Sequence, residues 1–283
     1  TTKTGKKGDG RNFTINYSGS MQARQVSMLP EMQNEFGQGW NGLQTYIENG
    51  SWGPALDGSM QVYGPIWNNQ QLIHPYTAKK DNVKEFFEAG LSQNHSIALS
   101  GMSNDNKMSY YLSYSYTNDD GIMPGDYDKY ERNTISLRNS YEATKWMKVS
   151  SSINFARSNT DAVGTFQGTS VIDGLYEMPR DISIIDMKDT SNPFYTPEAY
   201  YTPYGITNPY WALENNYNHT ESKQIYGKIQ VDIKPIKDLT LTYRMGFDYT
   251  DYDRKIGFPQ IALDDALINE DYGYGPSNMN QSG

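Results

Sequence analysis

Cysteine is absent from this chain of 283 residues. Its absence excludes disulfide bonds, thiolate metal sites and a cysteine nucleophile. Long apolar segments are also absent, since no stretch approaches the roughly 18 apolar residues that a membrane helix needs. Any role in a membrane must therefore rely on strands or on attachment to the surface.

Aliphatic side chains are scarce. Leu, Ile, Val and Phe together provide 50 residues, under a fifth of the chain, and such a share in water favours disorder. The 24 tyrosines and five tryptophans argue against disorder. Strands that turn one face to an apolar medium and the other to water need this kind of composition. The composition therefore favours β-structure.

Basic residues are in the minority. The chain has 24 Lys and Arg residues against 33 Asp and Glu residues, which gives a net charge of −9. An acidic chain repels the phosphate backbone of DNA and RNA. We therefore expect no nucleic-acid partner.

Seven segments alternate between apolar and polar residues, which places successive side chains on opposite faces of a strand. In the first segment, Phe13, Ile15 and Tyr17 alternate with Thr14 and Asn16. Most segments have about 10 residues, the length of a tilted strand that crosses a hydrocarbon core. The strands are predicted near 11–22, 95–102, 107–117, 131–141, 146–157, 223–233 and 239–250.

The predicted connections are of two kinds. Short turns of about five residues alternate with long loops, so that all turns lie at one end of the sheet and all long loops at the other. This asymmetry is typical of outer-membrane barrels, which have tight periplasmic turns and long extracellular loops. The predicted fold is thus all-β, a partial antiparallel transmembrane β-barrel. The long loops are expected at 23–94, 158–222 and 251–283, with a shorter one at 118–129.

Two soluble architectures, a β-sandwich and a propeller, also have alternating strands. A soluble core needs more Val, Ile and Leu than this chain has, and soluble sheets rarely combine long strands with one-sided loops. Seven strands cannot close a membrane barrel, for which about eight is the minimum. We therefore interpret the chain as part of a longer protein, with a soluble carbohydrate-binding β-domain as the alternative.

Motifs for catalysis or for metal binding are weak. Residues 37–42 match the dinucleotide pattern G-x-G-x-x-G, but no strand leads into them and no helix pattern follows. The histidines are scattered, and each is expected in a loop or at a strand end. Aspartate pairs in the loops do not fit the EF-hand spacing, which leaves calcium binding open. No enzyme activity, catalytic residue or cofactor is predicted.

The long loops are rich in proline and in aromatic residues. Proline stiffens a loop, and aromatic rings provide platforms for sugars or for a partner protein. The same rings could instead pack on each other to order the loop. A short helix is predicted near the end of the first loop, with Asn82 as its N-cap and Glu85 at position N3, burying Val83, Phe86 and Phe87.

Several motifs together resemble the SusC/RagA family of TonB-dependent outer-membrane transporters. The opening residues 1–8 (TTKTGKKG) are similar to the junction at which that family's plug domain leads into the barrel. The other motifs are 51–58 (SWGPALDG), 82–90 (NVKEFFEAG), 94–101 (NHSIALSG), 107–113 (KMSYYLS), 120–122 (DGI) and 130–132 (YER).

The resemblance implies a barrel of 22 strands around an N-terminal plug, in the outer membrane of a Gram-negative cell. It implies a SusD-like surface lipoprotein as a lid, TonB as the energy source, and oligosaccharides or, in some members, oligopeptides as substrates. Residues 1–10 would be the junction between plug and barrel, and residues 11–283 the first part of the barrel, surrounded by lipid.

Two groups of candidate site residues follow from this interpretation. Charged residues on the polar strand faces are expected to line the lumen, because charge is costly on the lipid side. Aromatic residues in the loops are expected to contact the substrate or the lid. The lumen-lining candidates are Arg138, Lys148, Lys228 and Arg244, and the contact candidates are Trp40, Trp52, Trp67, Tyr201, Tyr204 and Trp211.

Overall fold

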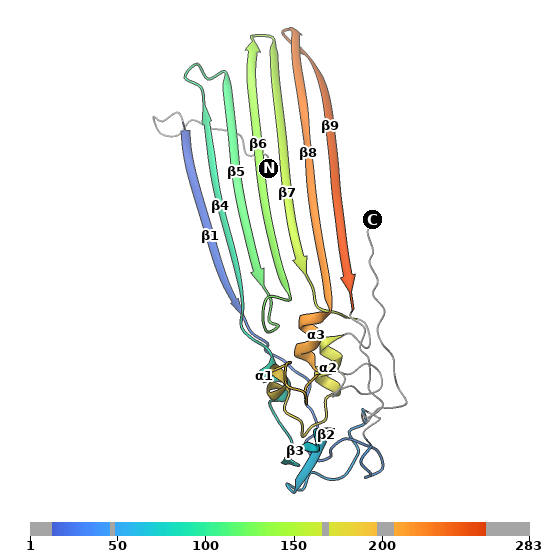
Figure 1. The fold of residues 1–283 in the computed structure, drawn as a ribbon. Helices are drawn as coiled ribbons and strands as arrows, with labels where there is room; N and C mark the ends of the chain where they lie inside the picture. The colour runs from blue at the N-terminus through green and yellow to red at the C-terminus, as the bar shows by residue number, and fades with distance from the viewer. Residues whose placement is uncertain (1–12, 46–48, 166–169, 197–206, 259–283) are drawn as a thin grey trace.

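A single antiparallel sheet of seven long strands dominates the structure (Figure 1). The computed structural model describes residues 13–45, 49–165, 170–196 and 207–258. The predicted all-β fold class is confirmed, and the sheet is open, with β1 and β9 at its edges. Its strands, in spatial order, are β1 (Phe13–Arg24), β4 (Gly90–Met102), β5 (Met108–Asp120), β6 (Lys129–Thr144), β7 (Met147–Asp161), β8 (Tyr217–Ile236) and β9 (Leu239–Gly257).

The pairing register brings the apolar residues of all seven strands onto one face. One row across the sheet joins Leu99 to Leu112, then Leu137, then Ile153. At the next strand Gly227 occupies the row, and Phe247 pairs with it from β9 and lies over the space where a Cβ would be. Leu99 is half-buried, whereas Leu112, Leu137, Ile153 and Phe247 are exposed, as are most other side chains of this face. The sheet therefore presents a wide apolar surface that no part of the described chain covers.

The apolar surface forms a band of limited height. On β9 it extends from Leu239 to Tyr249 through every second residue. Ten residue steps of about 3.3 Å give about 33 Å along the strand, and a tilt of about 40° reduces this to a height of about 25 Å. This height matches the apolar band of outer-membrane barrels.

Most strands continue beyond their predicted ends on the side of the long loops. β7 reaches Asp161 and β8 begins at Tyr217, several residues outside the predicted ranges. Both faces are polar there, and polar contacts join neighbouring strands, such as Arg157 Nε to Glu221 Oε1 at 2.6 Å and His219 Nδ1 to Asp161 Oδ1 at 2.6 Å. The backbone ladder persists where the apolar alternation ends, so alternation alone underestimated the strands.

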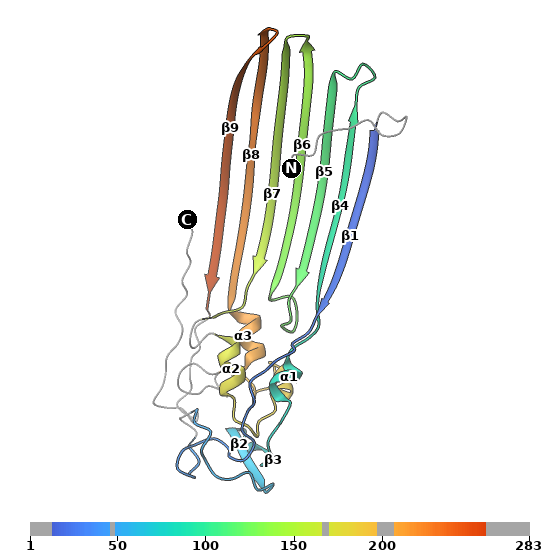
Figure 2. The ribbon, with the colours of Figure 1, turned by 180° about the vertical axis from the view of Figure 1, so that it is seen from behind.

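The long loops pack together at one end of the sheet, opposite the short turns (Figures 1 and 2). Their shared core includes Val83, Phe86, Leu175, Ile184 and Met187. In the described ranges, no helix is both long and apolar enough to span a membrane. The elements of this loop assembly are the hairpin β2 (Met60–Trp67) and β3 (Gln70–Pro75), the helices α1 (Asn82–Phe86), α2 (Val171–Glu177) and α3 (Pro209–Asn215), and the 3-10 helix η1 (Ile185–Lys188).

The helix predicted in the first loop is present as α1, but its N-cap is Asp81 and not Asn82. Asn82 lies inside the helix and is buried. Its amide donates to the carbonyl of Ile182 at 2.7 Å and accepts from the backbone N–H of Ile184 at 2.8 Å. The capping prediction was wrong because this side chain binds a segment 100 residues away instead of its own helix.

Replacement of Asn82 by alanine should loosen the loop assembly. The substitution leaves one buried N–H and one buried carbonyl unpaired, and each costs about 1–3 kcal/mol. We expect faster amide hydrogen exchange in residues 171–188, with the exchange of β7 and β8 unchanged. The matched control is Lys84→Ala, an exposed position of the same helix. Equal exchange in both variants would contradict the role assigned to Asn82.

Candidate functional site

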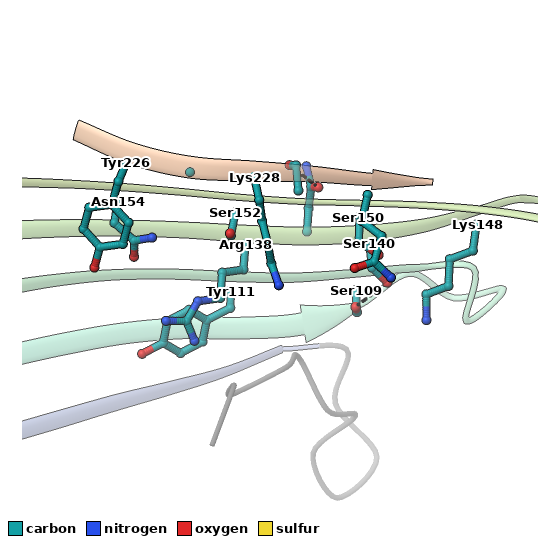
Figure 3. Close-up of a pocket in the computed structure, with 14 residues that line it drawn as sticks. Ser109, Tyr111, Arg138, Ser140, Lys148, Ser150, Ser152, Asn154, Tyr226 and Lys228 are labelled. Carbon is teal, nitrogen blue, oxygen red and sulfur yellow. Dashed lines mark hydrogen bonds between the residues drawn. The ribbon is translucent and has the colours of Figure 1, made fainter. Parts of the chain in front are cut away.

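A groove of about 500 Å³ lies on the polar face of the sheet, in the half nearer the short turns (Figure 3). Arg138 of β6, Lys148 of β7 and Lys228 of β8 line it, and none of the described residues that line it is acidic. Most of the remaining lining is short and polar. It includes Ser109, Ser140, Ser150, Ser152 and Asn154, together with the rings of Tyr111 and Tyr226.

The register explains why these cations meet. Ser152 pairs with Arg138 on one side and with Lys228 on the other, so a single row across three strands holds both charges. The guanidinium of Arg138 lies 5.5 Å from the ring centre of Tyr111, within cation–π range. The structure thus brings three of the four lumen candidates to one groove.

Arg244, the fourth candidate, lies beside the groove. Its Nε donates to Oε1 of Gln230 at 3.0 Å, and Gln230 lines the groove. The Gln230 amide in turn donates to Asp232, which also accepts from the hydroxyl of Thr242. Arg244 therefore shares the polar face with the other three cations.

Trp40 and Trp52 lie in a compact loop with few regular elements. Both are exposed, at 46% and 55% of their surface, and Trp52 packs against Phe36 with ring centres 5.6 Å apart. Backbone hydrogen bonds hold the two tryptophans in place, since Trp52 donates its N–H to Gly39 and Gly42 donates to Trp52, both at 2.9 Å. The loop therefore displays two aromatic rings on a fixed backbone.

The glycines that match the G-x-G-x-x-G pattern lie in this loop. Gly39 has φ +130°, and a Cβ there would lie 2.0 Å from the carbonyl oxygen of Leu43. A Cβ on Gly37 would lie 2.0 Å from the hydroxyl of Tyr76. In the described residues that flank the pattern, 25–36 form no strand and 43–45 form no helix. The glycines thus allow close packing within the loop, in agreement with the rejection of a dinucleotide site.

The other aromatic candidates belong to different segments of the chain. Trp211 is half-buried in α3, and Trp67 is the last residue of β2. Tyr201 and Tyr204 lie outside the described residues. The neighbouring Tyr210 belongs to the core, where its ring centre is 4.9 Å from that of Phe86 and burial raises its pKa to about 12. Tyr210 thus contributes to the order of its loop.

Sequence reasoning missed a buried polar cluster between the hairpin β2–β3 and the long loop 158–222. His74 lies at the end of β3, in agreement with the expectation of a loop or a strand end, and its Nε2 is 2.7 Å from Oδ2 of Asp181. Burial raises the pKa of Asp181, and the ring of Tyr63 lies 4.1 Å from the His74 ring. The segment Pro179-Arg180-Asp181, charged residues between apolar ones, was the available signal.

Metal binding finds little support in these residues. Among the described parts of the chain, no group of three or more His, Cys, Asp and Glu side chains could hold a metal ion. Asp128, from one of the aspartate pairs, instead accepts the backbone N–H groups of Ile122 and Met123. Burial raises its pKa. Its carboxylate thus orders the β5–β6 loop.

The fold is similar to that of chains in solved structures of the RagAB peptide importer. The "closed-closed" state matches with a TM-score of 0.60 and 22% identity, and the "open-open" state with 0.63 and 21%. A further RagAB peptide transporter structure gives 0.59 and 19%. Each match covers 93% of this chain and 30% of the other, so the chain spans under a third of its structural neighbours. No protein-family model and no curated protein sequence matches.

Two glycines provide a matched test of the tryptophan loop. Gly39 and Gly42 both have positive φ, but a Cβ on Gly42 meets nothing within 4 Å. We expect Gly39→Ala to accelerate amide exchange in residues 36–45 and 49–56 at least tenfold, because the new methyl group collides with the backbone of Leu43. Gly42→Ala should accelerate amide exchange in the same residues by a few-fold only. If the two variants behave alike, the close approach at Gly39 does not hold the loop.

Proposed function

We propose that the chain is part of an outer-membrane importer of the SusC/RagA type. The observation that carries the proposal is the exposed apolar band, about 25 Å high, on one face of a sheet whose other face is polar. A soluble carbohydrate-binding domain would have to expose this band to water. Patches of that size are rare on soluble monomers, which makes this alternative less suitable.

In this proposal the polar face lines the aqueous interior of a larger barrel. Arg138, Lys148, Lys228 and Arg244 then lie on the wall of the lumen, where their charges stay hydrated. The same side chains facing lipid would each cost about 2–4 kcal/mol at the midplane of the bilayer. The short turns would be periplasmic and the loop assembly extracellular.

The loop assembly is the proposed meeting point of the substrate and a lid. A SusD-like lipoprotein would cover it, as the similarity to RagAB chains suggests, and Trp40, Trp52, Trp67, Tyr201, Tyr204 and Trp211 would contact either the lid or the substrate. Exposed rings on a fixed backbone suit the apolar faces of oligosaccharides, and the structural neighbours import peptides. Coupling to TonB would involve parts of the protein outside these 283 residues.

A pair of adjacent substitutions tests the membrane orientation. Leu112 lies in the apolar band and Ser113 on the polar face of the same strand. We expect Leu112→Arg to reduce the amount of folded full-length protein in the outer membrane, because the charge would face lipid at a cost of up to about 2–4 kcal/mol. Ser113→Arg should leave it unchanged.

The measurement is the heat-modifiable mobility of the protein in the outer-membrane fraction. A full-length protein found in the soluble fraction, or two variants with equal assembly, would contradict the proposal.

Removal of a tryptophan tests the role of the loop. Trp52→Ala should weaken binding of the lid or of an oligosaccharide at least fivefold, because a stacked ring contributes about 1 kcal/mol or more. Binding is measured on the purified full-length protein in detergent, with Trp146→Ala, an exposed residue of a short turn, as the control. Unchanged affinity of the Trp52 variant for both partners would exclude this contact.

A further inference from the structure

Arg180 is a buried cation at the centre of the loop assembly. Only 3% of its surface is exposed. Its Nε donates to the carbonyl of Gln33 at 2.9 Å, and its Nη2 donates to Oδ1 of Asn34 at 2.8 Å and to the carbonyl of Lys79 at 3.4 Å. The side chain thus connects three segments that are far apart in the sequence.

The charge of Arg180 has no counter-ion among the described residues. All three acceptors are neutral oxygens, and the adjacent carboxylate, Asp181, is engaged by His74. Burial lowers the pKa of Arg180. A buried charge without an opposite charge costs several kcal/mol, which proteins usually avoid by pairing it. The local structure therefore favours the approach of an anion.

Arg180 also lines a groove of about 390 Å³. Four exposed charged residues surround it, and their charges cancel, since Lys80 and Lys84 oppose Glu31 and Asp81. The buried guanidinium thus sets the net charge of the groove. The remaining lining is largely apolar and consists of Leu29, Pro30, Met32 and Val83, with Asn34.

We propose that this groove, the Arg180 groove, binds a carboxylate group of the transported solute. A guanidinium donates charge-assisted hydrogen bonds to a carboxylate, and none of the three hydrogen bonds to Gln33, Asn34 and Lys79 uses Nη1, so Nη1 is the donor for the carboxylate. The apolar wall would hold the part of the solute next to the carboxylate. The volume lies at the lower end of the range for small-molecule sites and suits one or two units of a longer solute, such as a peptide or an oligosaccharide.

The identity of the solute rests on the proposed function. Two kinds of imported molecule carry a carboxylate, a peptide with a free C-terminus and an oligosaccharide that contains uronic acid. Both would present the same group to Arg180. The experiment below distinguishes the two sources.

The test compares acidic ligands with neutral ones, with the full-length protein in detergent. The peptide pair is N-acetyl-trialanine and its C-terminal amide, and the sugar pair is trigalacturonate and the neutral maltotriose. The readout is the rate of lysine acetylation, measured by mass spectrometry at Lys80 and Lys84. Lys188, paired with Glu88 outside the groove, is the internal control.

We expect one acidic ligand to protect Lys80 and Lys84 at a concentration at least tenfold lower than its neutral twin, with Lys188 unaffected. Protection by the peptide acid alone identifies peptides, and protection by the galacturonate alone identifies acidic sugars. Equal effects of the acidic and neutral twins, or no protection by any ligand at millimolar concentration, would overturn the proposal.

Two variants separate binding from a purely structural role. Arg180→Gln keeps hydrogen-bond donors and removes the charge, and Arg180→Lys keeps the charge and loses the guanidinium, whose Nη1 is the donor for the ligand. The effective concentration should rise at least tenfold for Arg180→Gln and by a smaller factor for Arg180→Lys, with Lys188→Gln as the unchanged control. If Arg180→Gln fails to fold, the comparison of acidic and neutral ligands on the unmodified protein still tests whether the groove binds a carboxylate.

This outcome is independent of the membrane proposal. A full-length protein that assembles in the outer membrane but does not distinguish acidic from neutral ligands removes the Arg180 proposal alone. Conversely, a full-length protein that is soluble but distinguishes acidic from neutral ligands would contradict the importer proposal and support the anion site.

Discussion

The register of the seven-stranded sheet is the constraint on which the other features depend. A shift of one residue between two strands would send every side chain of one strand to the opposite face. The pairs observed here keep the apolar residues together from Ile15 on β1 to Phe247 on β9. The apolar band and the basic groove are therefore two consequences of one pattern. A shift of β8 by one residue, for example, would place Lys228 in the band and Ile229 in the groove.

The loop assembly is held by different forces. Its helices have at most seven residues, too few for stability of their own. Buried polar side chains join its segments instead. Asn208, fully buried, caps α3 through the N–H of Tyr210 and donates to the carbonyls of Met187 and Tyr195. Together with Asn82 and Arg180 it satisfies backbone groups that loops without regular structure leave unpaired.

The sheet could be predicted from the sequence because its signal is local. Alternation of Phe13, Ile15 and Tyr17 with polar residues needs no knowledge of the partner strand, and it identified seven strands and their polar faces. The hairpin β2–β3 and the polar ends of the strands were missed because their alternation is weak or absent. The Arg180 groove and the contact of Asn82 with residue 182 depend on segments about 50 to 150 residues apart, for which the sequence has no periodic signal.

The charges are distributed unevenly between the two ends of the molecule. The loop segments 25–89, 121–128 and 162–216 contain sixteen acidic and five basic residues, whereas cations gather in the groove of the sheet. From Tyr217 to Lys228 the strand covers about 36 Å, several times the Debye length of about 8 Å at physiological salt. The two ends therefore act on a solute independently. Within the acidic loops, an anion gains little from long-range attraction and must be held by short-range contacts. A buried guanidinium such as that of Arg180 provides contacts of this kind.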